Sequence, residues 1–545
     1  MHTMESRTTQ GTSQLSRRSF VKVAGATGLA GMAAGASAAI ADEAQAGSDI
    51  AWDEEFDVVI VGSGIAGSST AAALALSGED VKVLLAEKGA ATQGNTPFAN
   101  GTVLYARDEE AAYQYMKEMA GENATTPDDV LAAYAKGLVS LYDWVFTDLG
   151  GNESEARNTE PATADSPENS NAEYPEYEHS WSVGKMRVGK SKEVEVQGPK
   201  HILTLVQNVV NEHADTVEFR FEAPMTDLIQ DPTTKRILGA VIGGKNVKAN
   251  KGVVMCCGGF ESDPVMLSNY LGVEGAVPGA GIGNTGDGHR ACMKAGADFW
   301  HMDHVAGFWM NGRDLENTVS TNTPTASDTG KRHGITVGVN GRRYYMDWDG
   351  FDTNGGQPYG SDARTNVGSR HAHGQFGGEW PHMIQPSKAW FIFDQAGLEA
   401  GAIPSSYSTD PVADGLAVTA DTIEELAALI DVPAEELVQT VDAWNSFCEG
   451  GVDLAFYRPA ETLEPVATAP FYAQLCAPEF LNTDGGPVRN AKAQVLDPDG
   501  NPIPGLYSAG EFGSIWCGGY NGGGNIAEGI IFGRIAAENV LAEQA

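Results

Sequence analysis

The sequence has little positive charge and none of the cysteine patterns that bind metal or haem. Its 545 residues hold 35 Lys and Arg against 73 Asp and Glu, a formal net charge of −38. A nucleic-acid-binding protein needs a basic surface to neutralise phosphates, so the composition excludes that class. The six cysteines form no C-x-x-C pair, no C-x-x-C-H haem attachment sequence and no zinc-ligand spacing. We therefore predict no metal, haem or iron–sulfur centre in this chain.

Glycine is the residue in excess. The chain has 66 glycines, roughly 12% of its residues against a usual value of about 7%. They are clustered and not periodic, which indicates close approach of the backbone to a ligand. The length predicts two to four domains, and 42% apolar residues suffice to build their cores.

The first 46 residues have the features of an export signal. Residues 16–22 read SRRSFVK, a twin-arginine signature, and an Ala/Gly-rich run with small-residue cleavage patterns follows. The run at residues 23–41 is too weakly apolar to predict a membrane span. We expect residues 1–46 to be a signal peptide that exports the protein to the periplasm or the outer face of the cell envelope. An uncleaved anchor and a chance arginine pair are the alternatives.

The cysteines leave two readings open in an exported protein. An even number of cysteines is compatible with disulfides. Cys256 and Cys257, however, lie inside an apolar strand pattern, which favours buried thiols. Neither possibility supplies an electron carrier.

After the signal, residues 56–87 have the pattern of a βαβ unit. Residues 56–62 read FDVVIVG, the continuous apolar run of a strand buried on both faces. The sequence GSGIAG follows at residues 62–67, then an Ala-rich helix at 68–76 and a second strand at 81–86.

The glycines of this unit have separable roles. Gly62 permits a tight turn, Gly64 lets the backbone approach a pyrophosphate, and Gly67 allows the helix to pack closely on the strand. The positive end of the helix then faces the phosphates, and Glu87 can accept bonds from ribose hydroxyls. The unit therefore predicts dinucleotide binding.

Three further segments favour a flavin over a nicotinamide. They are the polar stretch GNTPFANG at residues 94–101, the strand GVVMCCGGF at 252–260, and GLYSAGE at 505–511, which precedes GGGNIAE at 522–528 and a terminal helix. We therefore predict FAD. The residues expected to bind it are Gly62, Gly64, Ile65, Ala66, Gly67, Glu87, Lys88, Asn95, Thr96, Gly101, Gly258, Gly259, Asp287, Gly510, Glu511, Asn525 and Ile526.

The motifs taken together resemble a known family. FDVVIVGSGIAG, GVVMCCGGF, GNTGDGHRACMKAGA, NGRRYYMD and GLYSAGE followed by GGGNIAEGIIFGRIA are similar to the flavoprotein superfamily of fumarate reductase, urocanate reductase and 3-ketosteroid dehydrogenases. The resemblance implies an α/β fold with a discontinuous, Rossmann-like FAD-binding domain at residues 52–297 and 479–545. It also implies an inserted α+β capping domain at 298–478, with the substrate at their junction.

This sequence departs from the fumarate reductases at the positions that hold a dicarboxylate. Those enzymes use an HHTMGG-like segment and an Arg just before the final GGN, whereas this chain has LNTDGG at 481–486 and NGGGN at 521–525. A buried dicarboxylate without cations would lose several kcal/mol to desolvation. Fumarate is therefore a poor candidate substrate.

In place of these cationic residues the sequence has a neutral pair, Tyr520 and Gly524. Tyr520, four residues before Gly524, resembles the 3-ketosteroid dehydrogenases, in which a Tyr hydroxyl and a Gly amide grip a ketone oxygen. By this resemblance we predict Tyr520 as donor or acid to the activating carbonyl and the Gly524 N–H as second donor. Each donor could contribute about 3 kcal/mol in the transition state. The alternative is that Tyr520 only covers the flavin edge.

The proton donor has several candidates. The segment GRRYYMD at 341–347 matches the family pattern GxRFxxE, so Arg343 and Asp347 could relay protons. A buried salt link that holds the capping domain is the alternative for this pair. Arg370 and His371 lie about where the family places a catalytic Arg or Tyr, with an exposed polar loop as the alternative.

The sequence thus predicts an FAD-dependent enzyme that reduces an activated C=C bond by hydride transfer from flavin N5. The substrate would be an enone or α,β-unsaturated acid of steroid or phenolic type, and a role as terminal reductase in anaerobic respiration is one hypothesis. The alternatives are a 3-ketosteroid-type dehydrogenase working in the oxidative direction and a noncatalytic electron-transfer subunit. Because no carrier is visible in the chain, we expect an external donor, a membrane cytochrome or a flavoprotein, and contact with the membrane only through that partner.

Three other segments carry expectations about structure. Residues 151–180 are rich in Glu, Asn, Ser and Pro, and predict an exposed acidic loop. That loop is either a docking surface for a basic redox partner or simply solvated. The patterns at 127–149 and 422–449 predict helices, the second a helix pair.

Overall fold

The computed structural model describes residues 50–99, 101–121, 124–153, 156–167, 172–175, 177–188, 201–313, 330, 332–344, 347, 388–405, 408–517 and 519–543. The predicted signal peptide lies outside these residues, as do Arg370 and His371. Residues 51–231 and 235–545 belong to one compact unit. The description below concerns the described part of that unit.

The central sheet joins strands from both ends of the chain. Among the described residues its path is β18-β19-β9-β1-β2-β6, with β8 paired to β9 and β7 to β8. Neighbours among β19, β9, β1, β2 and β6 run parallel. The bounds are β1 (Glu54–Val61), β2 (Val83–Ala86), β6 (Val217–Arg220), β7 (Met225–Gln230), β8 (Ile237–Ile242), β9 (Lys245–Met255), β18 (Gln494–Leu496) and β19 (Pro502–Ser508). The discontinuous domain that the sequence predicts is therefore built around one sheet.

Both faces of this sheet are buried. In β1, Val58 and Ile60 belong to one apolar cluster, and Val59 and Val61 to another on the opposite face. This alternation is the period of two of a strand covered on both sides. Full burial of each such side chain contributes roughly 1.5–3 kcal/mol of transfer free energy.

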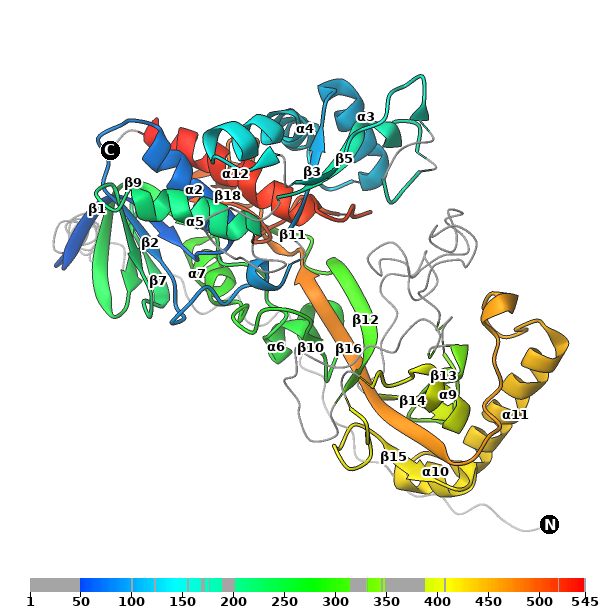
Figure 1. The fold of residues 1–545 in the computed structure, drawn as a ribbon. Helices are drawn as coiled ribbons and strands as arrows, with labels where there is room; N and C mark the ends of the chain where they lie inside the picture. The colour runs from blue at the N-terminus through cyan, green and yellow to red at the C-terminus, as the bar shows by residue number, and fades with distance from the viewer. Residues whose placement is uncertain are drawn as a thin grey trace, which may run out of the picture. The chain divides into compact units, whose positions relative to one another are not determined.

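Helices α2 (Ile65–Leu76) and α12 (Gly524–Leu541) cover one face and lie side by side, blue and red in Figure 1. Small residues allow this close contact, because a Cβ at Gly533 would lie only 2.7 Å from the Ala66 carbonyl oxygen. Helix α5 (His201–Glu212) packs beside α2, and α7 (Asp287–Ala295) contacts β7. The two helices that begin at the predicted glycine motifs thus begin next to each other.

A second, antiparallel layer lies beside α12. It consists of β3 (Thr102–Ala106), β4 (Arg157–Thr159) and β5 (Val183–Arg187), with α3 (Glu109–Ala120) and α4 (Asp128–Asp143) packed nearby. The helix predicted at 127–149 is α4 followed by a π-turn, η2 (Trp144–Asp148). The region predicted as an exposed acidic loop is partly folded inward, since β4 belongs to it and Tyr174 is buried.

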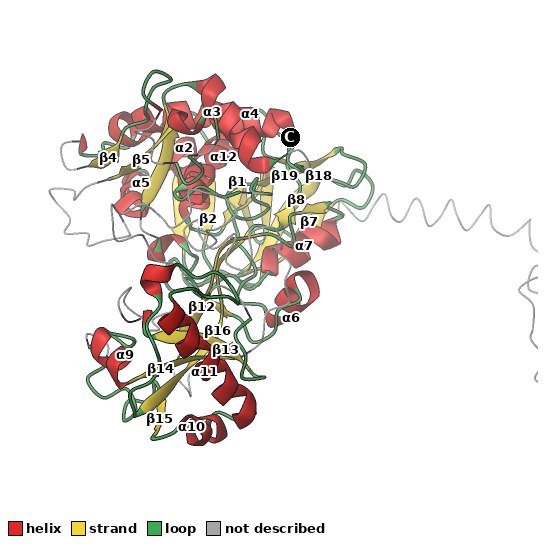
Figure 2. Ribbon diagram, turned by 90° about the vertical axis from the view of Figure 1, so that its right-hand side faces the viewer, coloured by secondary structure: helices red, strands yellow, loops and turns green. Residues whose placement is uncertain are grey.

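Strands of the inserted region form most of a six-stranded sheet among the described residues, to which β10 (Val277–Pro278), from before that region, also belongs. Strand β16 (Phe471–Thr483) is its long central strand, orange in Figure 1, and pairs with β14 through its first half and with β12 through its second. Helices α10 (Ile423–Leu429) and α11 (Ala434–Gly450) pack beside these strands in Figure 2, as the predicted helix pair. Strand β16 runs across the predicted boundary at 478/479. The other strands are β12 (Val305–Arg313), β13 (Gly334–Gly338), β14 (Ala389–Asp394) and β15 (Val418–Ala420).

Short elements complete the described chain. Two strands, β11 (Phe299–Trp300) and β17 (Gly486–Pro487), form a small antiparallel pair. The short helices are η1 (Thr96–Phe98), η5 (Ser180–Ser182), α6 (Pro264–Met266), η7 (Leu267–Leu271), α9 (Gln395–Ala400) and η8 (Ala460–Thr462).

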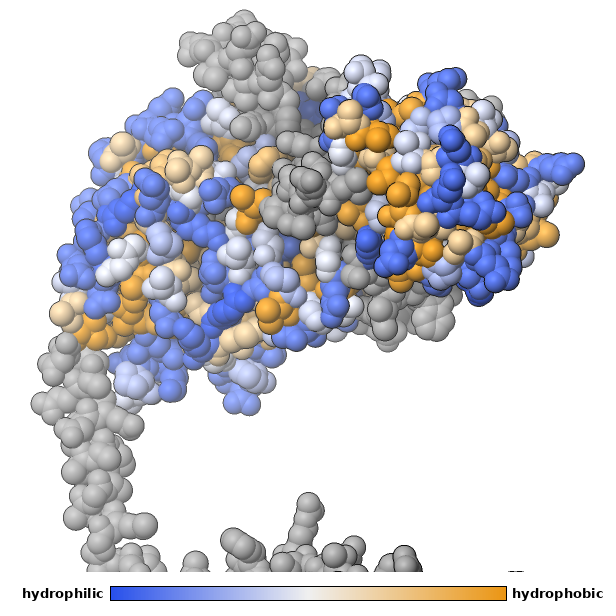
Figure 3. Space-filling model, turned by 90° about the horizontal axis from the view of Figure 1, so that it is seen from below, coloured by the Kyte–Doolittle hydropathy of each residue, from blue (hydrophilic) through white to orange (hydrophobic). Residues whose placement is uncertain are grey.

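The surface visible in Figure 3 is largely hydrophilic. Hydrophilic residues spread over the face shown in Figure 3, interspersed with smaller apolar groups. None of the helices in the described residues has the length and apolar character needed to span a bilayer.

Candidate active site

A cavity of about 420 Å³ opens where the parallel strands end. The strand pairing brings Val61, Ala86, Met255 and Ser508 to one edge of the sheet, and the residues that follow each of them line the cavity. Fifteen of the seventeen predicted cofactor residues line it, namely Gly62, Gly64, Ile65, Ala66, Glu87, Lys88, Asn95, Thr96, Gly101, Gly258, Asp287, Gly510, Glu511, Asn525 and Ile526. Its volume lies within the range of cofactor sites.

The other two predicted residues, Gly67 and Gly259, do not line the cavity but pack closely against their neighbours. A Cβ at Gly67 would lie 1.9 Å from the Gly62 carbonyl oxygen, and one at Gly259 would lie 2.2 Å from the Thr483 hydroxyl. Gly62 itself has a φ of +98°, a conformation that side chains disfavour. At Gly62 and at Gly67 the structure thus has room only for glycine.

We expect Gly67→Ala to release FAD. The added methyl group would force Gly62 away from α2 and misplace the loop at the helix N-terminus. The purified variant should bind FAD at least about tenfold more weakly than the wild type, a cost of about 1.4 kcal/mol. Flavin absorbance per mole of protein measures this loss. The control is Gly450→Ala, where a Cβ meets nothing within 4 Å, and equal FAD content in the two variants would contradict the close packing.

One end of the cavity is fixed by a carboxylate and an ion pair. Glu87 accepts bonds from the Ser63 backbone N–H (3.2 Å) and hydroxyl (2.7 Å) and from the Gly89 N–H (3.0 Å). Lys88 contacts Asp287 at 2.7 Å. Burial opposes ionisation of Asp287, but the bonds from Lys88 and Thr285 lower its pKa below the usual value. Both acidic groups are therefore held at the rim where the sequence predicts the ribose.

Glu511 lines the cavity, and a second acid, the buried Glu261, lies behind it and outside the lining. The Asn95 amide donates to Glu261 (2.6 Å) and to Glu511 (3.1 Å), and so joins the two carboxyls. Burial raises the pKa of both acids, and the charge of Glu261 raises that of Glu511 further. Glu261 was not predicted from the sequence, because it lies just beyond the GGF motif and gives no signal of its own.

The other end lies at the N-terminus of α12. Asn525 lines the cavity, and its buried amide oxygen and nitrogen both lack a hydrogen-bond partner among the described residues. Such orphaned polar atoms are rare in folded proteins unless a ligand satisfies them. Together with the glycine turn at α2, they fit a flavin dinucleotide: the turn would hold its phosphates, and Asn525 would bind its flavin end.

Tyr520 lines the cavity beside this end. Its side chain is only 5% exposed, and the Trp516 ring meets it edge-on at 5.1 Å. Its hydroxyl oxygen accepts a long bond, 3.4 Å, from the Asn525 N–H. Burial raises the pKa of this phenol above its usual range. Tyr520 is therefore a protonated group able to donate a hydrogen bond.

The second donor predicted from the sequence is engaged elsewhere. The Gly524 N–H donates to the Asn521 carbonyl at 2.9 Å, and Gly524 does not line the cavity. This bond closes the turn before α12. The Gly524 N–H, which the spacing assigns to a substrate oxygen, therefore donates within the protein instead. The backbone donors beside the Tyr520 hydroxyl are those of Asn525 and Gly523.

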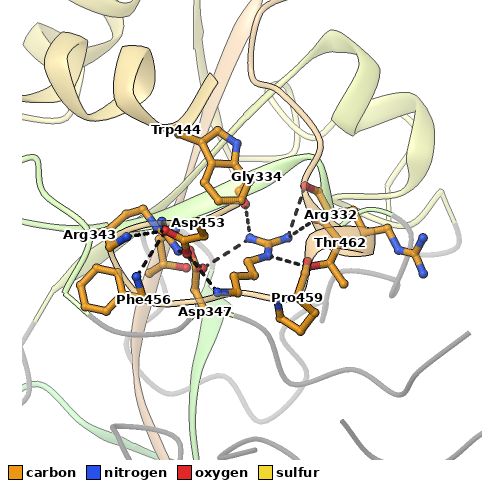
Figure 4. A network of polar contacts seen from close by, with 12 residues as sticks. Arg332, Gly334, Arg343, Asp347, Trp444, Asp453, Phe456, Pro459 and Thr462 are labelled. Carbon is orange, nitrogen blue, oxygen red and sulfur yellow. Dashed lines mark hydrogen bonds and ion pairs between the residues drawn. The ribbon is translucent and has the colours of Figure 1, made fainter. Parts of the chain in front are cut away.

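Arg343 and Asp347 do not line the cavity either. Arg343 donates to Asp347 (3.0 Å) and to both oxygens of Asp453 (3.1 and 2.9 Å), as Figure 4 shows. Arg458 reaches Asp347 at 3.4 Å, and both guanidinium groups lie over the Trp444 ring. This geometry is that of a buried link inside the inserted region, the alternative that the sequence left open, and the relay role remains a prediction.

Two charged residues of the cavity wall were not predicted, because their segment gives no functional signal in the sequence. Lys185 and Arg187, both on β5, line the cavity. The Arg187 guanidinium donates to the Thr102 hydroxyl at 2.8 Å. The alternation in VGKMRV predicts a strand, but nothing in it indicates that this strand reaches a site.

The cysteines are all free thiols. Cys256 and Cys257 follow β9 and line the cavity. Burial raises the pKa of the Cys256 thiol to about 12, so it stays neutral. Of the two interpretations of the cysteines, the structure therefore supports buried thiols over disulfides.

These features define a flavin-dependent oxidoreductase of the α/β type. A family model described as "FAD binding domain" matches residues 57–526, and the chain belongs to this family. FAD is its cofactor, and the relatives named below are reductases and dehydrogenases, which makes this chain an enzyme of the group that acts on C=C bonds.

Two related proteins align with this chain over different lengths. Digoxin reductase of Eggerthella lenta is 28% identical over 612 aligned positions, which span 97% of each chain. The 3-oxosteroid 1-dehydrogenase of Mycobacterium tuberculosis is 31% identical over 334 positions, 55% of this chain and 54% of that one.

Solved structures show the same fold. The 3-ketosteroid Δ1-dehydrogenase from Sterolibacterium denitrificans superposes with a TM-score of 0.67 at 20% identity, over 90% of this chain and 100% of that one. The open form of a flavocytochrome c3 fumarate reductase gives 0.64 at 22% identity, over 93% and 81%. The predicted superfamily resemblance and fold class are thus confirmed.

Proposed function

We propose that this enzyme reduces a C=C bond conjugated to a carbonyl group. The observation that carries the proposal is the buried, protonated Tyr520 in the cavity wall, beside the end assigned to the flavin ring. The two positions that would carry the dicarboxylate clamp, Leu481 and Asn482, also line the cavity and are neutral. A neutral donor suits the carbonyl oxygen of an enone.

The residues divide the work as follows. Bound FAD, once reduced by the external electron donor, would supply the hydride. Tyr520 donates a hydrogen bond to the carbonyl oxygen, which gains negative charge as the hydride arrives at the conjugated carbon. Burial of Tyr520 keeps water from competing for this bond and holds the phenol in its protonated form.

The relatives support a flat, apolar substrate. One is named for digoxin and another for 3-oxosteroids. Because Lys185 and Arg187 line the cavity, an α,β-unsaturated acid is the second candidate substrate class. The oxidative direction, that of a 3-ketosteroid-type dehydrogenase, is the alternative for the same site.

The cellular setting belongs to the same proposal. The twin-arginine sequence supports export, and the absence of haem and iron–sulfur motifs supports an external electron donor, a membrane cytochrome or flavoprotein. The enzyme would then serve as a terminal reductase in respiration.

The test is reoxidation of the reduced holoprotein. The flavin is reduced under anoxia with dithionite, excess reductant is removed, and fumarate, urocanate, a cinnamate or a 3-oxo-4-ene steroid is added. We expect the flavin band to return with a steroid or cinnamate at enzymatic rates, on the order of 10 per second. Fumarate turnover at such rates would contradict the argument that the dicarboxylate clamp is missing, and no reoxidation by any alkene would favour a noncatalytic subunit.

A further inference from the structure

The turn that carries Tyr520 is held by a segment more than 300 residues away. The Tyr520 N–H donates to the Tyr174 hydroxyl at 3.1 Å, and the Gly522 N–H donates to the Glu173 carboxylate at 3.0 Å. The Asn521 side-chain oxygen accepts a bond from the Glu173 N–H at 3.0 Å. Three consecutive residues of the turn are thus each bonded to Glu173 or Tyr174.

The contact is tightly packed as well as hydrogen-bonded. A Cβ at Gly519 would lie 2.9 Å from the Tyr174 ring, so the ring rests directly on the backbone before the turn. Tyr174 is 5% exposed and stacks on Tyr177 with a centroid distance of 5.6 Å. Tyr115 donates to the Asn521 side chain at 2.8 Å from the other side. The turn therefore has little freedom to shift.

Glu173 also contacts a charge in the cavity wall. The Lys185 ammonium lies 2.9 Å from the Glu173 oxygen that accepts from Gly522. Both side chains are largely buried, 25% and 12% exposed, and bonds to an ionised acceptor are about twice as strong as neutral ones. One carboxylate thus fixes both the turn and a cavity-lining cation.

The Tyr520 hydroxyl accepts from the Asn525 N–H at 3.4 Å, and the Gly523 N–H lies beside it. Both donors belong to the turn or to the residues directly after it, so the position of the hydroxyl depends on the backbone of the turn. A displacement of about 1 Å at a reacting group can cost on the order of 10²-fold in rate. We propose that Glu173 and Tyr174 are positioning residues, which hold the 520–523 turn so that the Tyr520 hydroxyl meets the substrate oxygen. The role of Tyr520 in this inference rests on the proposed function.

The test compares Glu173→Gln, Glu173→Ala and Tyr174→Phe in the FAD-loaded full chain. Glu178→Gln is the matched control, since Glu178 lies in the same segment with an exposed side chain. Amide hydrogen exchange of peptides that cover residues 519–526 reports the turn without any substrate. We expect exchange to speed up about tenfold in Glu173→Ala, less in Glu173→Gln and Tyr174→Phe, and not in the control.

The kinetic arm uses reoxidation by a 3-oxo-4-ene steroid. Glu173→Ala should lower kcat about tenfold and change KM less than about twofold. In a Tyr520→Phe background the same substitution should lower kcat less than about twofold, because residues that act as a unit are not additive. A purely structural role would lower kcat equally in both backgrounds.

The outcomes separate the two proposals. If the wild type is not reoxidised by any alkene, the proposed function fails. The hydrogen-exchange measurement alone then tests whether Glu173 and Tyr174 hold the turn. Unchanged exchange at 519–526, or an additive effect of Glu173→Ala and Tyr520→Phe, would overturn the inference. Should Glu173→Ala not fold, Glu173→Gln and Tyr174→Phe, which preserve side-chain size, give the same decision.

Discussion

Replacement of Tyr520 with phenylalanine should lower turnover by on the order of 10²-fold while FAD stays bound. The change removes the hydroxyl that donates to the carbonyl oxygen and leaves the ring, which packs against Trp516. The loss should fall on kcat, because the bond strengthens as negative charge develops on that oxygen. Stopped-flow reoxidation of the reduced enzyme by a 3-oxo-4-ene steroid measures it, together with the flavin content.

The control for this substitution is Tyr457→Phe. Tyr457 is 79% exposed, and its hydroxyl has no assigned function. Both variants should contain as much FAD as the wild type, and only Tyr520→Phe should be slow. If Tyr520→Phe turns over as fast as the wild type, the phenol only packs against its neighbours.

The second large effect concerns the buried link in the inserted region. Arg343→Met should lower the free energy of unfolding by about 3–5 kcal/mol, because it leaves the charges of Asp347 and Asp453 buried with too few partners. The two carboxylates are 2% and 0% exposed, so water cannot replace the guanidinium. Urea unfolding followed by tryptophan fluorescence measures the change.

The neighbouring arginine provides a matched control. Arg342 pairs with Glu436 at 2.6 Å, but its side chain is 61% exposed. Exposed pairs contribute about 0–1 kcal/mol, so Arg342→Met should change stability by less than about 1 kcal/mol. Equal destabilisation by the two variants would show that the buried network is not the source of stability.

The local parts of the site were predictable from the sequence. The turn at Gly62, the helix that ends at Leu76 and the end of the second strand at Ala86 follow from hydrophobic period and from glycines at fixed spacing, although the helix begins at Ile65, three residues before its predicted start. The contribution of Asn525 and Ile526 also follows from a motif at a helix N-terminus. Each of these signals lies within a few residues of the group that it places.

Contacts between distant segments were not predictable. Glu173 lies in the stretch predicted as an exposed acidic loop and Lys185 lies just after that stretch, and only the fold brings them to residues 520–523. The partner of Arg343 at Asp453 is 110 positions away and has no sequence signal. The position of Gly524 matches the spacing of the family motif. Spacing cannot show that the Gly524 N–H already donates to the Asn521 carbonyl.

The most direct test of the central claim is a crystal structure of the holoenzyme with an enone ligand. The account predicts the carbonyl oxygen at hydrogen-bonding distance from the Tyr520 hydroxyl, about 2.5–3.0 Å. A carbonyl oxygen held by an arginine such as Arg187, or a Tyr520 side chain directed away from the ligand, would contradict it.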